Sequence, residues 1–193
     1  MVVHTFPSEL GWMAVSWVGN RLTRLTFGQS TGAAAAMALT GGDMESATAK
    51  ETPPRWVLDV CERLQSYAAG HDEQFDDVPL DLSHLTGFQA KVAKACRAIR
   101  RGRVRTYGEL AASVGTPGAA RAVGSVMAKN RFPIIIPCHR VVGSSGSLGG
   151  FSADGGISVK RRMLEMEGVA LKGHKRAAGA VRRTGRSLSL AGA

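Results

Sequence analysis

A cysteine and a histidine stand side by side in the run Pro137-Cys138-His139-Arg140-Val141. The thiolate is the nucleophilic form of cysteine, and an adjacent imidazole is a common means of producing it near neutral pH. The run follows the apolar stretch 134–136 and precedes a loop of glycines and serines at 143–146. We therefore predict a buried strand over 134–136, ended by Pro137, and a reactive Cys138 on the turn that follows.

Two other interpretations of Cys138 are open. A cysteine near an apolar run is often a small core residue. A metal site would need two or three further ligands, and no paired spacing supplies them. The three cysteines, Cys61, Cys96 and Cys138, are far apart and form no CxxC pair. This pattern argues against a disulfide framework and favours a reducing compartment.

The charge is distributed unevenly along the 193 residues. Residues 1–87 carry 5 Lys/Arg and 11 Asp/Glu, a net −6, whereas residues 88–131 carry 10 and 1, a net +9. Residues 132–171 have a net +1 and residues 172–193 a net +6, which gives +10 for the chain. Such asymmetry suggests a polyanionic partner, nucleic acid first and an anionic membrane surface second, although a solvated charged face would look the same.

The composition is that of a globular protein, with 44% hydrophobic and 21% charged residues. No run reaches the ~18–20 apolar residues of a membrane span, and the N-terminus shows no signal-peptide pattern. We therefore expect a cytoplasmic protein without a membrane partner.

Strands and one helix are predicted for the first 85 residues. Partial alternation of apolar and polar residues around Gly19-Asn20 predicts a hairpin with strands 12–18 and 22–27. Residues 28–52 suggest a loop or a weak helix. Pro53-Pro54 can open a helix that ends at Gly70, and a short extended piece is expected at 78–82. One face of that helix would carry Trp56, Val57, Val60, Leu64 and Tyr67.

Helices dominate the prediction for residues 86–171. An apolar stripe predicts a helix from 87 that Gly102 terminates, and Thr106 with Glu109 forms a capping-box pattern at the start of a second helix. A turn at 115–117 and an alanine-rich helix over 118–129 complete the outline of a helix-turn-helix. A last helix is expected at 159–167. Residues 172–193 lack acids and apolar periodicity, which predicts a disordered basic tail.

Several segments resemble the O6-alkylguanine-DNA alkyltransferases, also called methylated-DNA–protein-cysteine methyltransferases. They are RTYGELAASVG at 105–115, AARAVGSVMAKN at 119–130, IPCHRVV at 136–142, SSG at 144–146, GGF at 149–151 and KRRMLEMEG at 160–168. The resemblance implies an α/β protein with a small N-terminal α/β, ribonuclease H-like subdomain at 1–85. A winged helix-turn-helix-like domain at 86–171 would carry the active-site cysteine, and the tail at 172–193 lies outside the resemblance.

The same resemblance implies an activity. An alkyl group would pass irreversibly from O6-alkylguanine, and from O4-alkylthymine, in double-stranded DNA to Cys138, once per molecule, after base flipping. No cofactor and no metal would take part, and the protein would be a monomer. His139 would remove the thiol proton through a water, Glu167 would orient His139, and Asn130 would tether the active-site turn.

Contacts with DNA follow from the resemblance as well. Arg121 would insert into the duplex, Tyr107 would press on the target phosphate and donate a proton to guanine, and Val141 and Ser152 would contact the flipped base. The further DNA or substrate contacts implied are Ala120, Ala122, Met127, Arg140, Ser144 and Phe151.

The sequence departs from the family pattern at three places. Arg131 stands directly after Asn130, where the family often has proline, and Phe151 stands where some relatives have tyrosine. Some relatives bind zinc in the N-terminal subdomain, but Cys61, His4, His71 and His84 match no such pattern, so we predict no structural zinc.

Three rival functions are weighed beside DNA repair. A damage sensor of the same fold would lack the cysteine that is present here. A helix-turn-helix regulator would explain the charge but would leave Cys138-His139 without a role. A cysteine hydrolase would use Cys138, His139 and Glu167 but not the basic helices, and it would turn over repeatedly.

Overall fold

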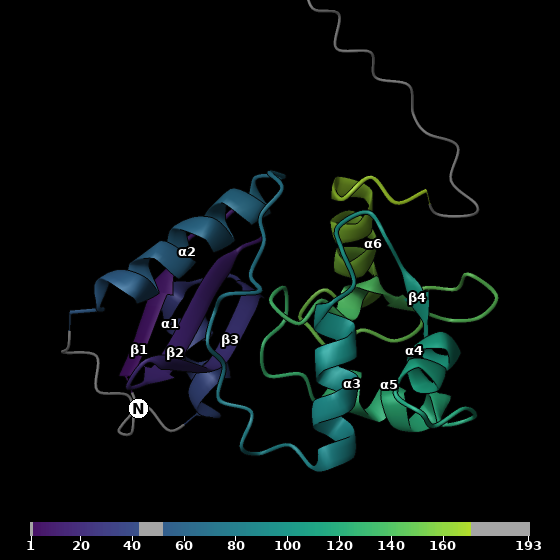
Figure 1. Cartoon of the computed structure of the whole chain (residues 1–193). Coiled ribbons are helices and arrows are strands. Elements are labelled where there is room, and N and C mark those ends of the chain that lie inside the picture. The colour runs from purple at the N-terminus through teal and green to yellow at the C-terminus, as the bar shows by residue number, and fades with distance from the viewer. Residues whose placement is uncertain (1, 43–51, 171–193) are drawn as a thin grey trace, which may run out of the picture.

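The computed structural model describes residues 2–42 and 52–170. The chain has a mixed α/β fold in which a small sheet with two helices is followed by a largely helical second half (Figure 1). One continuous cluster of buried apolar side chains joins the two halves, from Met13 in the sheet to Val92, Leu110 and Cys138. The predicted basic tail lies outside the described residues.

An antiparallel sheet of three strands forms the start of the chain. Its strands are β1 (Val2–Phe6), β2 (Trp12–Val18) and β3 (Arg21–Gln29), in the order β1-β2-β3. Val18 pairs with Arg21 across the Gly19-Asn20 turn, which confirms the predicted hairpin. Gly19 has φ +57°, a conformation that suits a residue without a Cβ atom. Strand β1 was not predicted.

Two helices cover opposite faces of this sheet. Helix α1 (Gly32–Thr40) packs Ala35 and Leu39 against Ala14, within the segment predicted as a loop or weak helix. Helix α2 (Arg55–Ala68) starts after Pro53-Pro54 as predicted and shares the main core with Met13, a neighbour of Ala14 on β2. Successive side chains of a strand point to opposite faces, so the sheet is buried on both sides.

The second half begins with α3 (Gly87–Arg97), β4 (Arg105–Thr106), α4 (Tyr107–Ser113) and α5 (Ala120–Ala128). The 3-10 helix η1 (Cys138–Arg140), β5 (Val141–Val142) and α6 (Gly156–Met166) follow. The capping box of Thr106 and Glu109 is confirmed. The predicted end of α3 at Gly102 is wrong: Ala98 caps the helix, and the chain turns before Gly102.

The buried strand predicted over 134–136 is also wrong. These residues form a buried turn, in which the Ile136 amide donates to the Phe132 carbonyl at 2.8 Å. Ile134 has φ +72°, in the left-handed region that a β-branched residue rarely adopts. An apolar run fixes burial but does not distinguish a strand from a compact turn.

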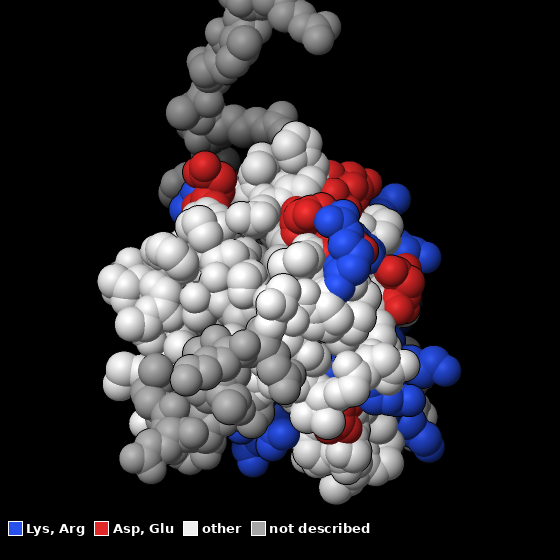
Figure 2. Space-filling view, turned by 90° about the vertical axis from the view of Figure 1, so that its left-hand side faces the viewer, with Lys and Arg blue, Asp and Glu red and all other residues white. Residues whose placement is uncertain are grey.

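Several arginines of the basic segment 88–131 bind other residues of the same chain. Arg100 forms an ion pair with Asp76 at 2.7 Å, and Arg97 donates to the carbonyls of Phe75 and Val78. Figure 2 shows acidic and basic side chains lying side by side near the top of the view. In the first half of the chain, Arg63 pairs with Asp77 at 2.8 Å. The net +9 of residues 88–131 is therefore only partly available to an external polyanion.

Arg101 connects three separate parts of the chain. Its guanidinium donates to the carbonyls of Gly70 (2.7 Å), His71 (2.8 Å) and Met166 (2.8 Å). The first two follow α2 and the third belongs to α6, so one side chain joins the two halves of the molecule.

We expect Arg101→Met to lower the free energy of unfolding by about 2–3 kcal/mol, because charged hydrogen bonds to three carbonyls are lost together. Urea denaturation measures the loss. The control is Arg103→Met, at an exposed arginine two positions further on, which should stay within about 0.5 kcal/mol of the parent. Equal losses in the two variants would contradict this role of Arg101.

Candidate active site

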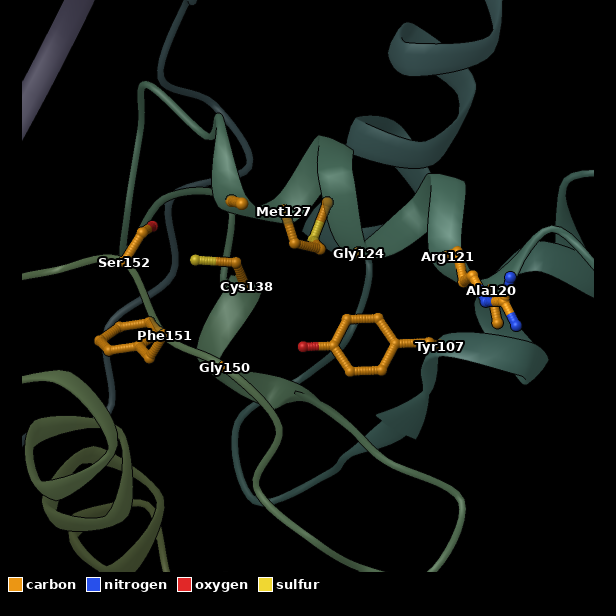
Figure 3. A pocket seen from close by; sticks show the side chains of 10 residues that line it. Tyr107, Ala120, Arg121, Gly124, Met127, Cys138, Gly150, Phe151 and Ser152 are labelled. Carbon is orange, nitrogen blue, oxygen red and sulfur yellow. The ribbon is translucent and has the colours of Figure 1, made fainter.

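A cavity of about 580 Å³ opens between α4, α5 and the loop that precedes α6. In Figure 3 the Cys138 sulfur and the Tyr107 hydroxyl point into the space bordered by Phe151 and Ser152. Cys138 is 7% exposed and lines this cavity, and it also lines a second pocket of about 230 Å³ that Phe27 and Asn130 border. The lining residues are Tyr107, Ala120, Arg121, Gly124, Met127, Ala128, Cys138, Gly150, Phe151 and Ser152.

Asn130 shapes the turn that presents Cys138. Its side-chain amide donates to the Ile136 carbonyl at 2.7 Å, and its side-chain oxygen accepts from the Phe132 amide at 3.0 Å. These two bonds hold both ends of the turn that contains the left-handed Ile134. Backbone in such a conformation costs about 1–3 kcal/mol and persists only where the surroundings impose it. Asn130 therefore fixes the backbone that leads to Cys138.

Buried His139 is bound through one ring nitrogen. Nε2 lies 2.9 Å from Glu167 Oε1, and the ring is 0% exposed. Nδ1 is buried and has no hydrogen-bond partner within residues 2–42 and 52–170. Because a carboxylate only accepts hydrogen bonds, the ring hydrogen belongs on Nε2. Nδ1 is then an unprotonated nitrogen that can accept a proton.

Glu167 is the acceptor for three neighbouring side chains. Tyr67 Oη donates to its Oε1 at 2.7 Å, and Arg140 donates through Nε to Oε2 and through Nη2 to Oε1, both at 2.9 Å. With the His139 bond, four hydrogen bonds converge on one carboxylate that is 6% exposed. The bonds from His139 and Arg140 hold the pKa of Glu167 well below its usual range, although burial acts the other way. The carboxylate is thus ionised near neutral pH.

Burial also sets the charge state of the two adjacent groups. Loss of solvation raises the pKa of the Cys138 thiol, against the opposing effects of Asn130 and Lys160. Burial lowers the pKa of His139, and the neighbouring Glu167 only partly compensates. Both shifts favour the neutral thiol and the neutral imidazole over a thiolate–imidazolium ion pair.

Lys160 places a buried ammonium beside the cavity wall. It is 0% exposed, its Nζ donates to the Val141 carbonyl at 2.6 Å, and it lies 6.0 Å from the ring centroids of Tyr107 and Phe151. Burial lowers the pKa of Lys160 to about 8. Its charge favours a negative sulfur at Cys138.

The structure brings together most of the predicted site residues. The cavity lining contains Cys138 and the predicted contact residues Tyr107, Ala120, Arg121, Met127, Phe151 and Ser152. The other three predicted catalytic residues do not line the cavity. Asn130 holds the turn that leads to Cys138, and Glu167 binds the neighbouring His139. Four others do not line the cavity: Ala122 and Ser144 are exposed elsewhere, Val141 is buried beside Lys160, and Arg140 is bound inside the protein.

Arg140, a predicted DNA or substrate contact, does not line the cavity. Its guanidinium is 8% exposed and is bound to Glu167 and to the Ile99 carbonyl. A basic residue beside a nucleophile suggests an anion ligand, but this one neutralises an internal carboxylate. Arg140 is part of the support for His139.

Sequence analysis missed Tyr67 as a site residue. It was placed on the apolar face of a helix, and the structure confirms this position, with 1% of the side chain exposed. The available signal was its hydroxyl, because a buried tyrosine hydroxyl requires a hydrogen-bond partner. The small residues Gly124, Ala128 and Gly150 also line the cavity.

Within the described part of the chain, no group of three or more His, Cys, Asp or Glu side chains is placed to hold a metal ion. In the same residues no helix is both long and apolar enough to cross a membrane. The absence of structural zinc stays a prediction.

Comparison with known proteins gives consistent matches. The family model for the DNA binding domain of 6-O-methylguanine DNA methyltransferase matches residues 87–169. A methylated-DNA–protein-cysteine methyltransferase of Mycobacterium tuberculosis is 42% identical over 164 residues, which cover 84% of this chain and 90% of that protein. One from Methanothermobacter thermautotrophicus is 38% identical over 122 residues, 63% of this chain and 67% of that protein.

Solved structures agree with these matches. A crystal structure of Mycobacterium tuberculosis OGT in complex with DNA has a TM-score of 0.68 at 38% identity, covering 86% of this chain and 92% of that one. The O6-methylguanine-DNA methyltransferase of Pyrococcus kodakaraensis has a TM-score of 0.61 at 28% identity, covering 87% and 99%.

Glu167→Gln tests the ionised state of the buried carboxylate. The folded-state pKa of Glu167 is depressed, so its charge stabilises the fold above the unfolded-state pKa of about 4.3, and this contribution is lost as the pH falls. We expect the native free energy of unfolding to fall more steeply from pH 5 to pH 2 than that of the variant. At pH 7 the variant should be about 3–5 kcal/mol less stable, because Arg140 keeps an uncompensated buried charge.

Urea denaturation at several pH values measures both effects. Glu165→Gln, at the exposed carboxylate of α6 two positions before Glu167, is the control and should follow the native curve. If the free energy of unfolding changed with pH in the same way for the native protein and Glu167→Gln, the pKa of Glu167 would not be depressed in the folded state.

Proposed function

This chain belongs to the methylated-DNA–protein-cysteine methyltransferase family, and we propose that Cys138 is the residue that receives the alkyl group. The protein is a DNA-binding methyltransferase that repairs DNA by transfer of an alkyl group to a cysteine. One observation carries the choice of residue: of its three cysteines, Cys138 lines the cavity and precedes a buried histidine bound to a carboxylate. Cys61 and Cys96 are core residues.

The proposed substrate is O6-alkylguanine in double-stranded DNA, with O4-alkylthymine as a second one. An alkyl group inside a duplex is out of reach of Cys138, so the nucleotide must leave the stack, at a cost of a few kcal/mol. A cavity of about 580 Å³ lies within the range of small-ligand sites, roughly 300–1,000 Å³. The cavity is thus suited to receive a flipped base.

Helices α4 and α5 supply the proposed DNA contact as a helix-turn-helix. The cavity side of α5 carries Ala120, Gly124 and Ala128, whose small side chains would let the helix approach the minor groove closely. Arg121 lies on the rim of the same cavity, exposed, where it can enter the space that the flipped nucleotide leaves. Exposed cations such as Lys91, Lys94 and Lys129 add phosphate attraction without sequence preference.

The proposed chemistry is a single displacement. The Cys138 proton passes, through a water, to Nδ1 of His139, and Glu167 stabilises the imidazolium that forms. The sulfur lone pair attacks the alkyl carbon, the S–C bond forms, and the C–O6 bond breaks with its electrons on the guanine. Tyr107, whose hydroxyl faces the cavity, donates a proton to the guanine. The thioether is not readily reversed, so each molecule reacts once.

The arrangement of the chain supports further proposals. Residues 1–85 would form a ribonuclease H-like α/β subdomain, and residues 86–171 a winged helix-turn-helix-like domain that carries Cys138. A monomeric state and a cytoplasmic location stay predictions.

Intact-mass analysis tests the function. After incubation with a duplex that carries one O6-methylguanine, we expect the protein to gain one methyl group and to stop at one equivalent, with the methyl on Cys138. Cys138→Ala should gain none and should still bind the duplex, because Arg121 and α5 are intact. Cys61→Ala is the control and should react like the native protein.

Other outcomes would overturn the proposal. Binding to damaged DNA without an adduct on the native protein would indicate a damage sensor. Product formation beyond one equivalent would indicate a hydrolase-like enzyme, and a methyl group on Cys61 or Cys96 would contradict the assignment of Cys138.

A further inference from the structure

Tyr67 reaches the active site from the other half of the chain. It lies in the last turn of α2, whereas Cys138, His139 and Glu167 follow more than 70 positions later. Its hydroxyl is 2.7 Å from Glu167 Oε1 and 3.2 Å from His139 Nε2, and these are its two side-chain partners among the described residues. A tyrosine that served only packing would not direct its single polar atom at both supports of the nucleophile.

The positions of the hydrogens around Tyr67 can be assigned. The Tyr67 hydroxyl has one hydrogen, and the ionised Glu167 can only accept, so that hydrogen lies on the 2.7 Å bond to Oε1. The hydroxyl then offers only lone pairs to His139. Nε2 therefore faces two acceptors, Glu167 Oε1 and Tyr67 Oη, and must itself carry the ring hydrogen. The arrangement excludes the tautomer with a hydrogen on Nδ1.

The Tyr67 ring is held rigidly. It is 1% exposed and packs against Phe75 in an edge-to-face arrangement with centroids 6.3 Å apart. The guanidinium of Arg101 lies over the ring at 5.8 Å and also binds the carbonyls directly after α2. Burial and the neighbouring Glu167 raise the pKa of Tyr67, so the hydroxyl keeps its hydrogen at working pH.

We propose that Tyr67 is a positioning residue for alkyl transfer, whose hydroxyl acts with Glu167 to keep the hydrogen of His139 on Nε2. Nδ1 thereby stays bare and able to take the proton of Cys138. This inference rests on the proposed function. It also gives the first half of the chain a part in the chemistry, since α2 supplies a group on which the base depends.

The test compares Tyr67→Phe with the native protein in two measurements. Single-turnover methyl transfer from saturating O6-methylguanine duplex should slow about tenfold, the loss expected for one hydrogen bond to a charged group. The ¹⁵N NMR signals of labelled histidine, with His139 assigned by its absence in His139→Gln, should show Nε2–H alone in the native protein. In Tyr67→Phe a fraction of Nδ1–H should appear, while the dissociation constant for the duplex stays unchanged.

Phe75→Leu is the matched control, because it disturbs the packing of the Tyr67 ring and leaves the hydroxyl in place. It should keep the native tautomer and a transfer rate within about twofold, even where it lowers stability. A native rate and tautomer in Tyr67→Phe, or the same losses in Phe75→Leu, would overturn the inference.

The native spectrum is informative even if Tyr67→Phe does not fold, because Nδ1–H in the native protein would by itself contradict the inference. Failure of the native protein to accept a methyl group would instead refute the proposed function, so the two failures are distinguishable.

Discussion

The buried carboxylate of Glu167 is the interaction on which the site depends. Four hydrogen bonds reach it, from Tyr67, His139 and Arg140. A buried anion is stable only where donors and positive charge surround it, and Arg140 supplies that charge. Burial lowers the pKa of His139, and the charge of Arg140 lowers it further against the effect of Glu167, which favours the neutral imidazole. In the proposed transfer, the imidazolium would meet a carboxylate already in position, which needs no rearrangement at the moment of reaction.

The same constraint explains why the two halves share one core. Glu167 follows α6, Arg140 ends η1, and Tyr67 belongs to α2, so the carboxylate joins elements from both ends of the described chain. Arg101 strengthens this junction through the carbonyls of Gly70, His71 and Met166. The cavity is lined by Cys138 and by small residues of α5, whereas His139 and Glu167 are not among its lining residues.

Local sequence patterns predicted those features of the structure that depend only on residues close together in the chain. The Thr106–Glu109 capping box, the hairpin around Gly19-Asn20 and the Cys138-His139 pair need only neighbouring residues, and each is found as expected. Contacts distant in sequence were not accessible in this way. Tyr67 and Glu167 are 100 positions apart, and nothing in an apolar helix face shows that one hydroxyl meets a carboxylate. The ion pair of Arg140 was not foreseen because its partner lies 27 positions later, and the turn at 134–136 depends on the side chain of Asn130.

The most direct test of this account is the single-turnover rate of methyl transfer from saturating duplex between pH 5 and pH 9. If neutral His139 takes the Cys138 proton, the rate should rise as the imidazolium loses its proton, with a midpoint below 6.5, because burial lowers the pKa of His139 from that ordinary value. Above the midpoint the rate should stay level to about pH 8. A rate that instead climbs about tenfold per pH unit through pH 8–9 would mean that hydroxide removes the thiol proton, and it would contradict the role assigned to His139 and its carboxylate.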